Sequence, residues 1–158
     1  ENCKTLRIVS CGIIENWCEE KCLNHELIYD PQFSNHTYTR FTTQKIRKLF
    51  PPLTEPISGW KWNDIAFYEI DKRKDCFQIS LTLCSDNMTD EQRNACVEIS
   101  KALGLPDKKS NWRWKRINSW KRHLISPDLG DDEYRLKIEK ALDTDWSDIQ
   151  EFEAGLML

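Results

Sequence analysis

The chain is poor in glycine and has no long apolar run, and each shortage excludes a class of protein. Only five of its 158 residues are glycine, all isolated from one another, which excludes a glycine-rich loop that cradles phosphate groups. The apolar runs extend over only a few residues, far short of the roughly 20 that a membrane-spanning helix needs, so we predict no membrane segment. No cationic start followed by an apolar stretch is visible either, so we predict no signal peptide within this sequence.

Histidine is also scarce, and its three copies are scattered, so no Ser/His/Asp or Cys/His arrangement can be built from them. We therefore predict no cofactor and no nucleophilic active site. A metal-dependent nuclease would need carboxylates and a lysine clustered at neighbouring strand ends. The loose candidates are spread by their spacing over both strand faces and a loop, so this enzyme is only an alternative; they are Asp64, Glu69, Asp71 and Lys72.

Cysteine is abundant by contrast, but its seven copies are odd in number and irregularly spaced. Several fall at apolar positions, where a free cysteine behaves as a small hydrophobic residue. This usage favours a reducing, cytoplasmic compartment over a disulfide framework. Cys18 and Cys22, followed by His25 and His36, are geometrically able to bind zinc, but they lack the paired CxxC units of structural zinc sites. We therefore predict ordinary buried thiols and no metal.

The composition is that of an ordinary globular protein, with 39% hydrophobic and 31% charged residues. We predict one domain over residues 1–158, long enough to bury a core. Within it we expect a mostly helical part at 1–50, a hairpin–helix–hairpin core at 57–125 and C-terminal helices at 128–158. Because the chain starts at Glu1 and not at Met, we also consider that it is a piece of a longer protein.

The clearest structural signal is a β-hairpin within Ile57–Cys84, with the charged loop Asp71–Asp75 at its tip. Apolar and polar residues alternate from Phe77 to Leu83, which is typical of a half-buried strand. The partner strand, Trp62–Ile70, places two apolar residues on one face, Ile65 and Phe67, and three on the other, Ala66, Tyr68 and Ile70.

Helices are predicted on both sides of this hairpin. Apolar spacing favours a helix over Leu6–Leu23, and Thr42 or Thr43 is expected to cap a short helix that Pro51 stops. Thr89 to Gln92 fits a capping box, whose helix would end at Gly104 and Pro106.

Residues 111–125 alternate with tryptophans two apart, which indicates a second hairpin that turns at Asn118 and Ser119. Two acidic helices should follow, the second capped by Thr144. Two adjacent hairpins among helices predict an α+β fold: an antiparallel sheet built from β-hairpins with helices packed on one face and an acidic helical C-terminus.

Charge is distributed unevenly along the last third of the chain. Lys108–His123 holds seven Lys/Arg and no acid, whereas Asp128–Leu158 holds ten Asp/Glu against three Lys/Arg. Cations neutralise phosphates, and an exposed indole stacks on an unpaired base, so the basic segment predicts nucleic-acid contact. The candidate residues are Lys108, Lys109, Trp112, Arg113, Trp114, Lys115, Arg116, Lys121 and Arg122, extended by the hairpin tip Lys72, Arg73 and Lys74. The same alternation also fits a plainer interpretation, in which the tryptophans are core and the cations form a solvated face beside the acidic helices.

A resemblance rests on apolar and aromatic positions: Phe41-Thr42, Ile46, Leu49-Phe50-Pro51, Pro56-Ile57-Ser58-Gly59-Trp60, Phe67-Tyr68-Glu69-Ile70, Leu81-Thr82-Leu83 and Trp112-Arg113-Trp114. Over about residues 40–125 the chain resembles the C-terminal region of bacterial proteins whose N-terminal part is a PD-(D/E)XK nuclease-like domain. The catalytic signature of that family is missing, because neither Pro106-Asp107 nor Pro127-Asp128 is followed by a strand ending in acid-x-Lys. No catalytic residue is therefore carried over. The resemblance implies a bacterial or phage origin, a role in defence against foreign DNA, and an accessory module.

From these observations we predict a non-catalytic accessory domain that binds DNA or RNA through the basic tryptophan-rich segment. The alternative is a protein-interaction module or homodimer that uses an exposed apolar or acidic surface, including the C-terminal helices. Nucleic-acid binding requires that the cations are not neutralised by the carboxylates of those helices.

Overall fold

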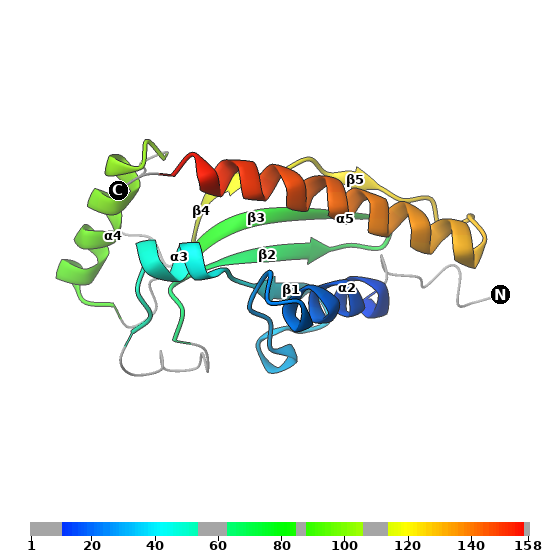
Figure 1. Cartoon of the computed structure of the whole chain (residues 1–158), viewed down its shortest axis with the longest axis horizontal. Helices are drawn as coiled ribbons and strands as arrows, with labels where there is room; N and C mark the ends of the chain where they lie inside the picture. Colours follow the sequence, from blue (N-terminus) through cyan, green and yellow to red (C-terminus); the bar gives the residue numbers. More distant parts are fainter. Residues whose placement is uncertain (1–10, 54–62, 85–87, 106–113, 157–158) are drawn as a thin grey trace.

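The computed structural model describes residues 11–53, 63–84, 88–105 and 114–156. The fold is α+β, as predicted, with helices packed on an open antiparallel sheet (Figure 1). In chain order the elements are α2 (Cys11–Leu23), the 3-10 helix η1 (Pro31–Phe33), β1 (Tyr38–Phe41), α3 (Gln44–Leu49), β2 (Ala66–Lys72), β3 (Cys76–Cys84), α4 (Asp90–Ala102), β4 (Trp114–Ser119), β5 (His123–Leu124) and α5 (Asp131–Ala154).

The predicted hairpin is the centre of the sheet. β2 and β3 pair from Ala66↔Leu83 to Lys72↔Phe77. Arg73 N–H then donates to Cys76 O at 2.8 Å, so the hairpin closes around Lys74 and Asp75. The strands thus extend further into the charged tip than the sequence pattern indicated. Two of the three polar positions that alternate along β3 are also buried, since Ser80 is 4% and Thr82 2% exposed. At these positions the alternation separates polar from apolar side chains and not exposed from buried ones.

β1 is a strand within residues 1–50, the part of the chain predicted to be mostly helical, so that prediction is wrong here. It pairs antiparallel with β2 from Tyr38↔Asp71 to Phe41↔Tyr68. Ile28, in the segment between α2 and η1, forms a single antiparallel bridge with Thr42. Both segments therefore extend the sheet on the β2 side.

The predicted second hairpin is wrong. β4 and β5 both pair with β3 and follow one another along its outer side, with Ser119 opposite Ser80 and His123 opposite Phe77. Residues 120–122 lie between them, and Trp120 N–H still donates to Ile79 O at 2.9 Å. The register also shifts at Leu81/Thr82. The residues expected to form a turn instead lie within an irregular strand at the side of the sheet.

The predicted pair of acidic helices is in fact one helix of 24 residues, α5. Thr144 does not cap a second helix, because its hydroxyl donates to Lys140 O at 3.0 Å, one turn back in the same helix. The buried residues recur every three or four positions through this point, so packing along one stripe keeps the helix continuous. They are Tyr134, Ile138, Leu142, Asp145, Trp146 and Ile149.

The two predicted helix caps are confirmed. Thr43 accepts from Ile46 N–H at the start of α3, and Thr89 forms a full capping box with Gln92 at the start of α4. The predicted end of the first helix at Leu23 is also correct. Glu26 N–H donates to Lys21 O and His25 N–H to Cys22 O, which is the Schellman arrangement. His25 has a φ of 59°, a conformation that favours glycine and costs other residues about 1 kcal/mol.

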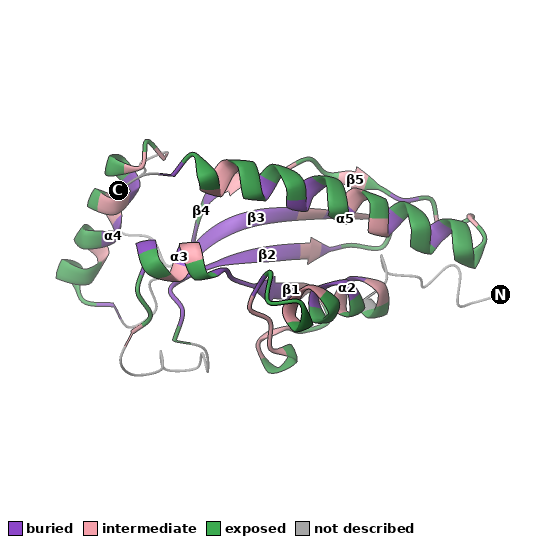
Figure 2. Cartoon of the chain, viewed as in Figure 1, coloured by how far each residue is buried: buried purple, intermediate pink, exposed green. Residues whose placement is uncertain are grey.

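One face of the sheet is covered by α2 and α5, and we call it the helix-covered face (Figure 2). At its centre Phe41 stacks on Tyr68, with ring centroids 5.1 Å apart. Trp17 from α2 and Trp146 from α5 meet Phe41 edge-on at 6.4 and 6.0 Å. Trp17 also donates to Asp143 of α5 at 2.9 Å, so the two helices are fastened to each other as well as to the sheet.

The C-terminal end of α5 is bonded to the sheet by a carboxylate. Glu153 Oε2 accepts from the Tyr68 hydroxyl at 2.6 Å and from the Thr43 hydroxyl at 2.7 Å. Burial raises the pKa of Glu153, while the two hydroxyl groups and Lys45 oppose the rise. Leu156, just beyond the helix, is 4% exposed and belongs to the core.

The opposite face of the sheet, which we call the polar face, carries charged and hydroxyl side chains. Arg40 Nε donates to Glu69 Oε2 at 2.8 Å, and each side chain of this pair is 9% exposed. Ser80 and Ser119 share a hydrogen bond of 2.8 Å between β3 and β4. These residues, with Tyr38, Asp71, Gln78 and Arg116, alternate with those beneath the helices.

Replacing Glu69 by Ala should lower the free energy of unfolding by about 3 kcal/mol, because the buried Arg40 guanidinium would lose its counter-charge. Urea denaturation would measure the loss. The control is Glu98→Ala, which removes the partner of Lys101 at 3.5 Å on an exposed side of α4 and should change stability by less than about 0.5 kcal/mol. Equal losses in the two variants would contradict this account of the pair.

Replacing Glu153 by Gln should remove a pH-dependent penalty. A carboxyl whose pKa is raised in the folded state contributes stability at low pH that is lost as the pH rises through that pKa. Glutamine keeps an oxygen for both hydroxyl groups and does not ionise. We expect the stability of Glu153→Gln relative to the wild type to grow as the pH rises above about 4.3, the ordinary pKa of glutamate.

Urea midpoints across this pH range measure the difference. Glu151→Gln, on an exposed position of the same helix, is the matched control and should show no such trend. A constant offset between Glu153→Gln and the wild type at every pH would refute the assignment.

Candidate nucleic-acid interface

Three of the predicted cations meet on the polar face of the sheet. Arg73 follows β2, Arg116 lies on β4, and Arg122 lies in the break between β4 and β5. Together they line a hollow of about 280 Å³, which we call the arginine hollow. Its remaining lining comes from the hairpin, namely Asp71, Cys76, Phe77 and Gln78.

A single carboxylate lies among these arginines. Arg73 Nε is 2.9 Å from Asp71 Oδ1, and Arg116 is 3.8 Å from Asp71 Oδ2. The hydrogen bond to Asp71 raises the pKa of Arg73 further above its already high value, so this guanidinium stays charged. Among the described lining residues three arginines stand against one aspartate, an excess of two positive charges. The Arg73 and Arg116 side chains are 60% and 54% exposed, so both remain accessible to a solute anion.

Tyr38 stands beside the hollow and was not among the predicted residues. It pairs with Asp71 across β1 and β2, and its phenol acts electrostatically on Arg73. Its ring is half-exposed and lies 5.1 Å from the Arg40 guanidinium. The signal in the sequence is the alternation Tyr38, Arg40 against Thr39, Phe41, which becomes informative once β1 is known to be a strand.

Two predicted phosphate contacts lie inside the protein. Lys72 is 2% exposed on the helix-covered face, where its Nζ donates to Asn35 O at 3.0 Å. Lys115 is 5% exposed and pairs with Leu83 on that same face, where its charge acts on Cys96 of α4. Nucleic-acid contact requires both side chains to point outward, but the strand register places them on the helix-covered face.

The other predicted residues divide into two groups. Lys74 is exposed at the hairpin tip, and Lys121 is exposed near Asp145 of α5. Burial raises the pKa of Asp145, and the charge of Lys121 is among the effects that oppose this rise. The remaining candidates lie outside the described residues, with only the backbone of Trp114 described; they are Lys108, Lys109, Trp112, Arg113 and the Trp114 side chain.

Among the described residues, no ion pair joins α5 to the arginines that line the hollow. The ion pairs found for Arg73 and Arg116 are with Asp71 of β2, whereas the carboxylates of α5 that contact the sheet do so on the helix-covered face. Asp145 Oδ2 lies 2.9 Å from His123 Nε2, and Glu153 binds Tyr68 and Thr43. The ion-pair partner found for both Arg73 and Arg116 therefore comes from the sheet and not from α5.

The carboxylates considered for a nuclease are not brought together. Asp64 forms two hydrogen bonds to Arg47, at 2.9 and 2.8 Å, and Glu69 pairs with Arg40. Lys72 lies on the opposite face of β2 from Glu69. Among the described residues no group of three or more His, Cys, Asp or Glu could hold a metal ion, which leaves the zinc alternative without support.

Comparison of the chain with protein-family models, with curated proteins and with solved structures finds no match. The resemblance to the C-terminal region of PD-(D/E)XK nuclease-like proteins therefore stays a prediction. Within the described part of the chain, no helix is long and apolar enough to cross a membrane.

Proposed function

We propose that this domain is a non-catalytic module that binds single-stranded nucleic acid on the polar face of its sheet. In this proposal the arginine hollow receives backbone phosphates, and Tyr38 stacks on a base. The observation that carries it is the convergence of Arg73, Arg116 and Arg122 on one hollow with two positive charges in excess.

The size and position of the hollow favour a single strand over a duplex. Its volume of about 280 Å³ suits one phosphate group with part of its sugar, and its described lining comes from strands and their connections rather than from a helix that would enter a groove. Arginine presents a fork of donors that matches phosphate oxygens, and an aromatic ring stacks on any base. Gln78 adds a polar side chain at the floor, although its Nε2 already donates to Trp120 O at 2.8 Å.

The cysteines and the sequence resemblance suggest a cellular setting for this module. The described cysteines Cys18, Cys22, Cys76, Cys84 and Cys96 are all unbridged, which supports a reducing compartment such as the cytoplasm. A bacterial or phage defence system, in which this module would accompany a nuclease, is the setting that the sequence resemblance suggests.

The double variant Arg116→Ala with Arg122→Ala should bind a single-stranded oligonucleotide roughly tenfold more weakly at low salt, the effect of about 1.4 kcal/mol. Loss of two phosphate contacts should also flatten the dependence of log K on log salt by about 1.4. Fluorescence anisotropy across a salt series measures both. Asp71→Asn provides a test of opposite sign, because it removes the negative charge from the hollow and should tighten binding.

The matched control is Arg135→Ala with Lys137→Ala, which removes two exposed cations from the other side of the molecule, on α5. It should leave both the affinity and the salt slope close to those of the wild type. Equal effects of the two double variants would mean that binding depends only on the net charge of the protein, and would overturn the proposed site.

Tyr38→Leu should weaken binding of a single strand by about 1–3 kcal/mol, the usual contribution of one stacked base. A duplex, whose bases are already stacked, should lose much less. Because leucine keeps the strand apolar at this position, circular dichroism should show an unchanged fold. An equal loss for single strand and duplex would argue against stacking by Tyr38.

A protein-interaction module is the second candidate, and a groove between α2 and α5 favours it. The groove has a volume of about 760 Å³ and is lined by Trp17, Leu136 and four carboxylates against two lysines. Leu136 is 62% exposed there. A mass of 18.8 kDa at both low and high concentration in light scattering would remove the homodimer form of this candidate.

A further inference from the structure

A cavity distinct from the arginine hollow and from the α2–α5 groove lies near the C-terminal end of α5. It has a volume of about 370 Å³ and lies between the end of α2 with its following loop, the start of α3 and the end of α5. It is separate from the arginine hollow, with which it shares no lining residue. The side chains that matter for its chemistry are Glu153, Thr43, Lys45, His25, Glu26 and Leu27.

Glu153 is the polar group of this cavity whose orientation is fixed by hydrogen bonds to its carboxylate. The hydroxyl groups of Tyr68 and Thr43 both donate to its Oε2, at 2.6 and 2.7 Å. Burial and the neighbouring carboxylate raise the pKa of Tyr68, so this hydroxyl stays protonated and remains a donor. Among the described residues none donates a hydrogen bond to Oε1. The carboxylate is thus held in one orientation with one oxygen left to accept from a ligand.

The negative charge of the cavity lining favours a positively charged ligand. Among the described carboxylates and lysines of the lining, Glu26 and Glu153 stand against Lys45, an excess of one negative charge. Glu26 is partly engaged already, because it accepts from Trp146 at 3.3 Å and lies 3.6 Å from Lys21. Burial makes the charged form of Glu153 costly, as the rise of its pKa shows, and a bound cation would offset that cost.

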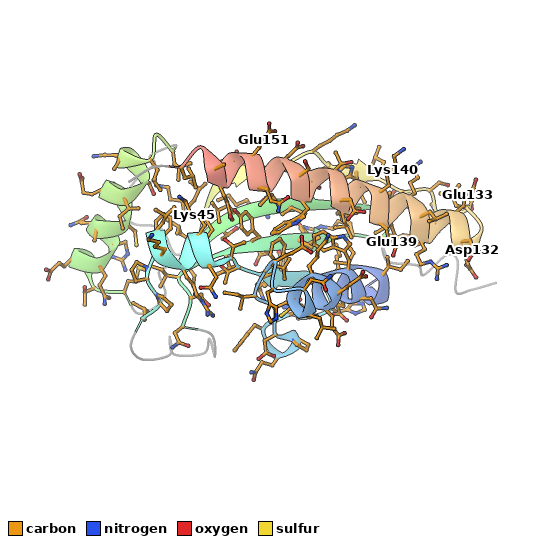
Figure 3. All side chains as sticks on the ribbon, viewed as in Figure 1. Lys45, Asp132, Glu133, Glu139, Lys140 and Glu151 are labelled. Carbon is orange, nitrogen blue, oxygen red and sulfur yellow. The ribbon has the colours of Figure 1, made fainter. Side chains whose placement is uncertain are left out.

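The walls of the cavity suit a short aliphatic chain. Leu27, which is 4% exposed, and Ile28 supply apolar surface beside the carboxylates. The volume is at the lower end of the range of small-molecule sites, which starts at about 300 Å³. His25 lines the rim, at the left-handed position where glycine would be the unstrained residue. Figure 3 shows Lys45 on α3 below the end of α5, and Glu151 on the side of α5 away from it.

We propose that this cavity binds a primary alkylammonium group, with the ammonium on the Glu153 carboxylate and the alkyl chain on Leu27 and Ile28. The group would come from a free amine or from a lysine side chain, since both present the same chemistry. The assignment is independent of nucleic-acid binding at the arginine hollow.

The test is a titration of the full chain, labelled with nitrogen-15, with n-butylamine at neutral pH. We expect saturable shifts in the millimolar range for amide signals of Leu27, Thr43 and Lys45. n-Butanol has the same alkyl chain without the charge and should give no saturable shift. A response to n-butanol equal to that to n-butylamine, or no saturation with n-butylamine, would overturn the proposal.

Two variants separate the site from general charge. Glu153→Gln keeps acceptors for both hydroxyl groups, so it should stay folded and lose binding by tenfold or more. Glu151→Gln removes the same charge two residues away on an exposed position and should bind as the wild type does. Binding should also weaken as the pH falls and Glu153 becomes protonated. Unchanged affinity in Glu153→Gln, or equal loss in both variants, would refute the assignment.

A second arm distinguishes the two sources of the group. N-acetyl-lysine amide carries the same ammonium on a peptide-like backbone. Tighter binding of this compound than of n-butylamine would support a lysine side chain of a partner, and equal or weaker binding would support a free amine. Both results require the saturable response, and failure of both compounds would end the proposal without bearing on the arginine hollow.

Discussion

The packing of α5 across one face of the sheet is the interaction on which the rest of the structure depends. Its buried stripe covers the Phe41–Tyr68 stack together with Trp17 and closes the only large aromatic cluster seen in the described residues. Because successive side chains of a strand point to opposite faces, covering one face with helices also decides what lies on the other. Tyr38, Arg40, Glu69, Asp71 and Gln78 thereby share the polar face, whereas Thr39 and Lys72 lie on the helix-covered face.

The two proposed sites are consequences of this arrangement. Tyr68 points toward α5 and helps to orient Glu153, whereas Asp71, three residues further along β2, points to the arginine hollow. The sheet therefore separates a negative cavity beneath the helix from a positive hollow on the far side. Opposite charges of this kind would neutralise each other if they shared one face, and the strand alternation keeps them apart.

Features that depend on neighbouring residues could be predicted from the sequence, whereas strand pairing between distant segments could not. The hairpin and the caps at Thr43 and Thr89 depend on neighbouring residues, and the structure confirms them. β1 has only four residues and is stabilised as a strand by pairing with β2, which no local pattern reveals. Thr144 looks like a cap, but burial of the stripe on both sides of it outweighs that preference.

The candidate site was predicted in part for the same reason. Charge counting identified Arg116 and Arg122, but the direction of each side chain depends on register, so the burial of Lys72 and Lys115 was missed. A lysine can bury its alkyl stem when its amine has a hydrogen-bond acceptor, as Lys72 has at Asn35 O. A basic segment in sequence is therefore not one basic surface.

The interruption between β4 and β5 has a consequence for the protein in crowded solution. An uninterrupted outer strand offers a row of free amide and carbonyl groups on which another chain can add a strand, the first step toward fibrils. Here the two register irregularities, near Leu81 and at residues 120–122, break that row into short pieces. The same break between β4 and β5 that contains Arg122 thus also hinders aggregation by strand addition at this edge of the sheet.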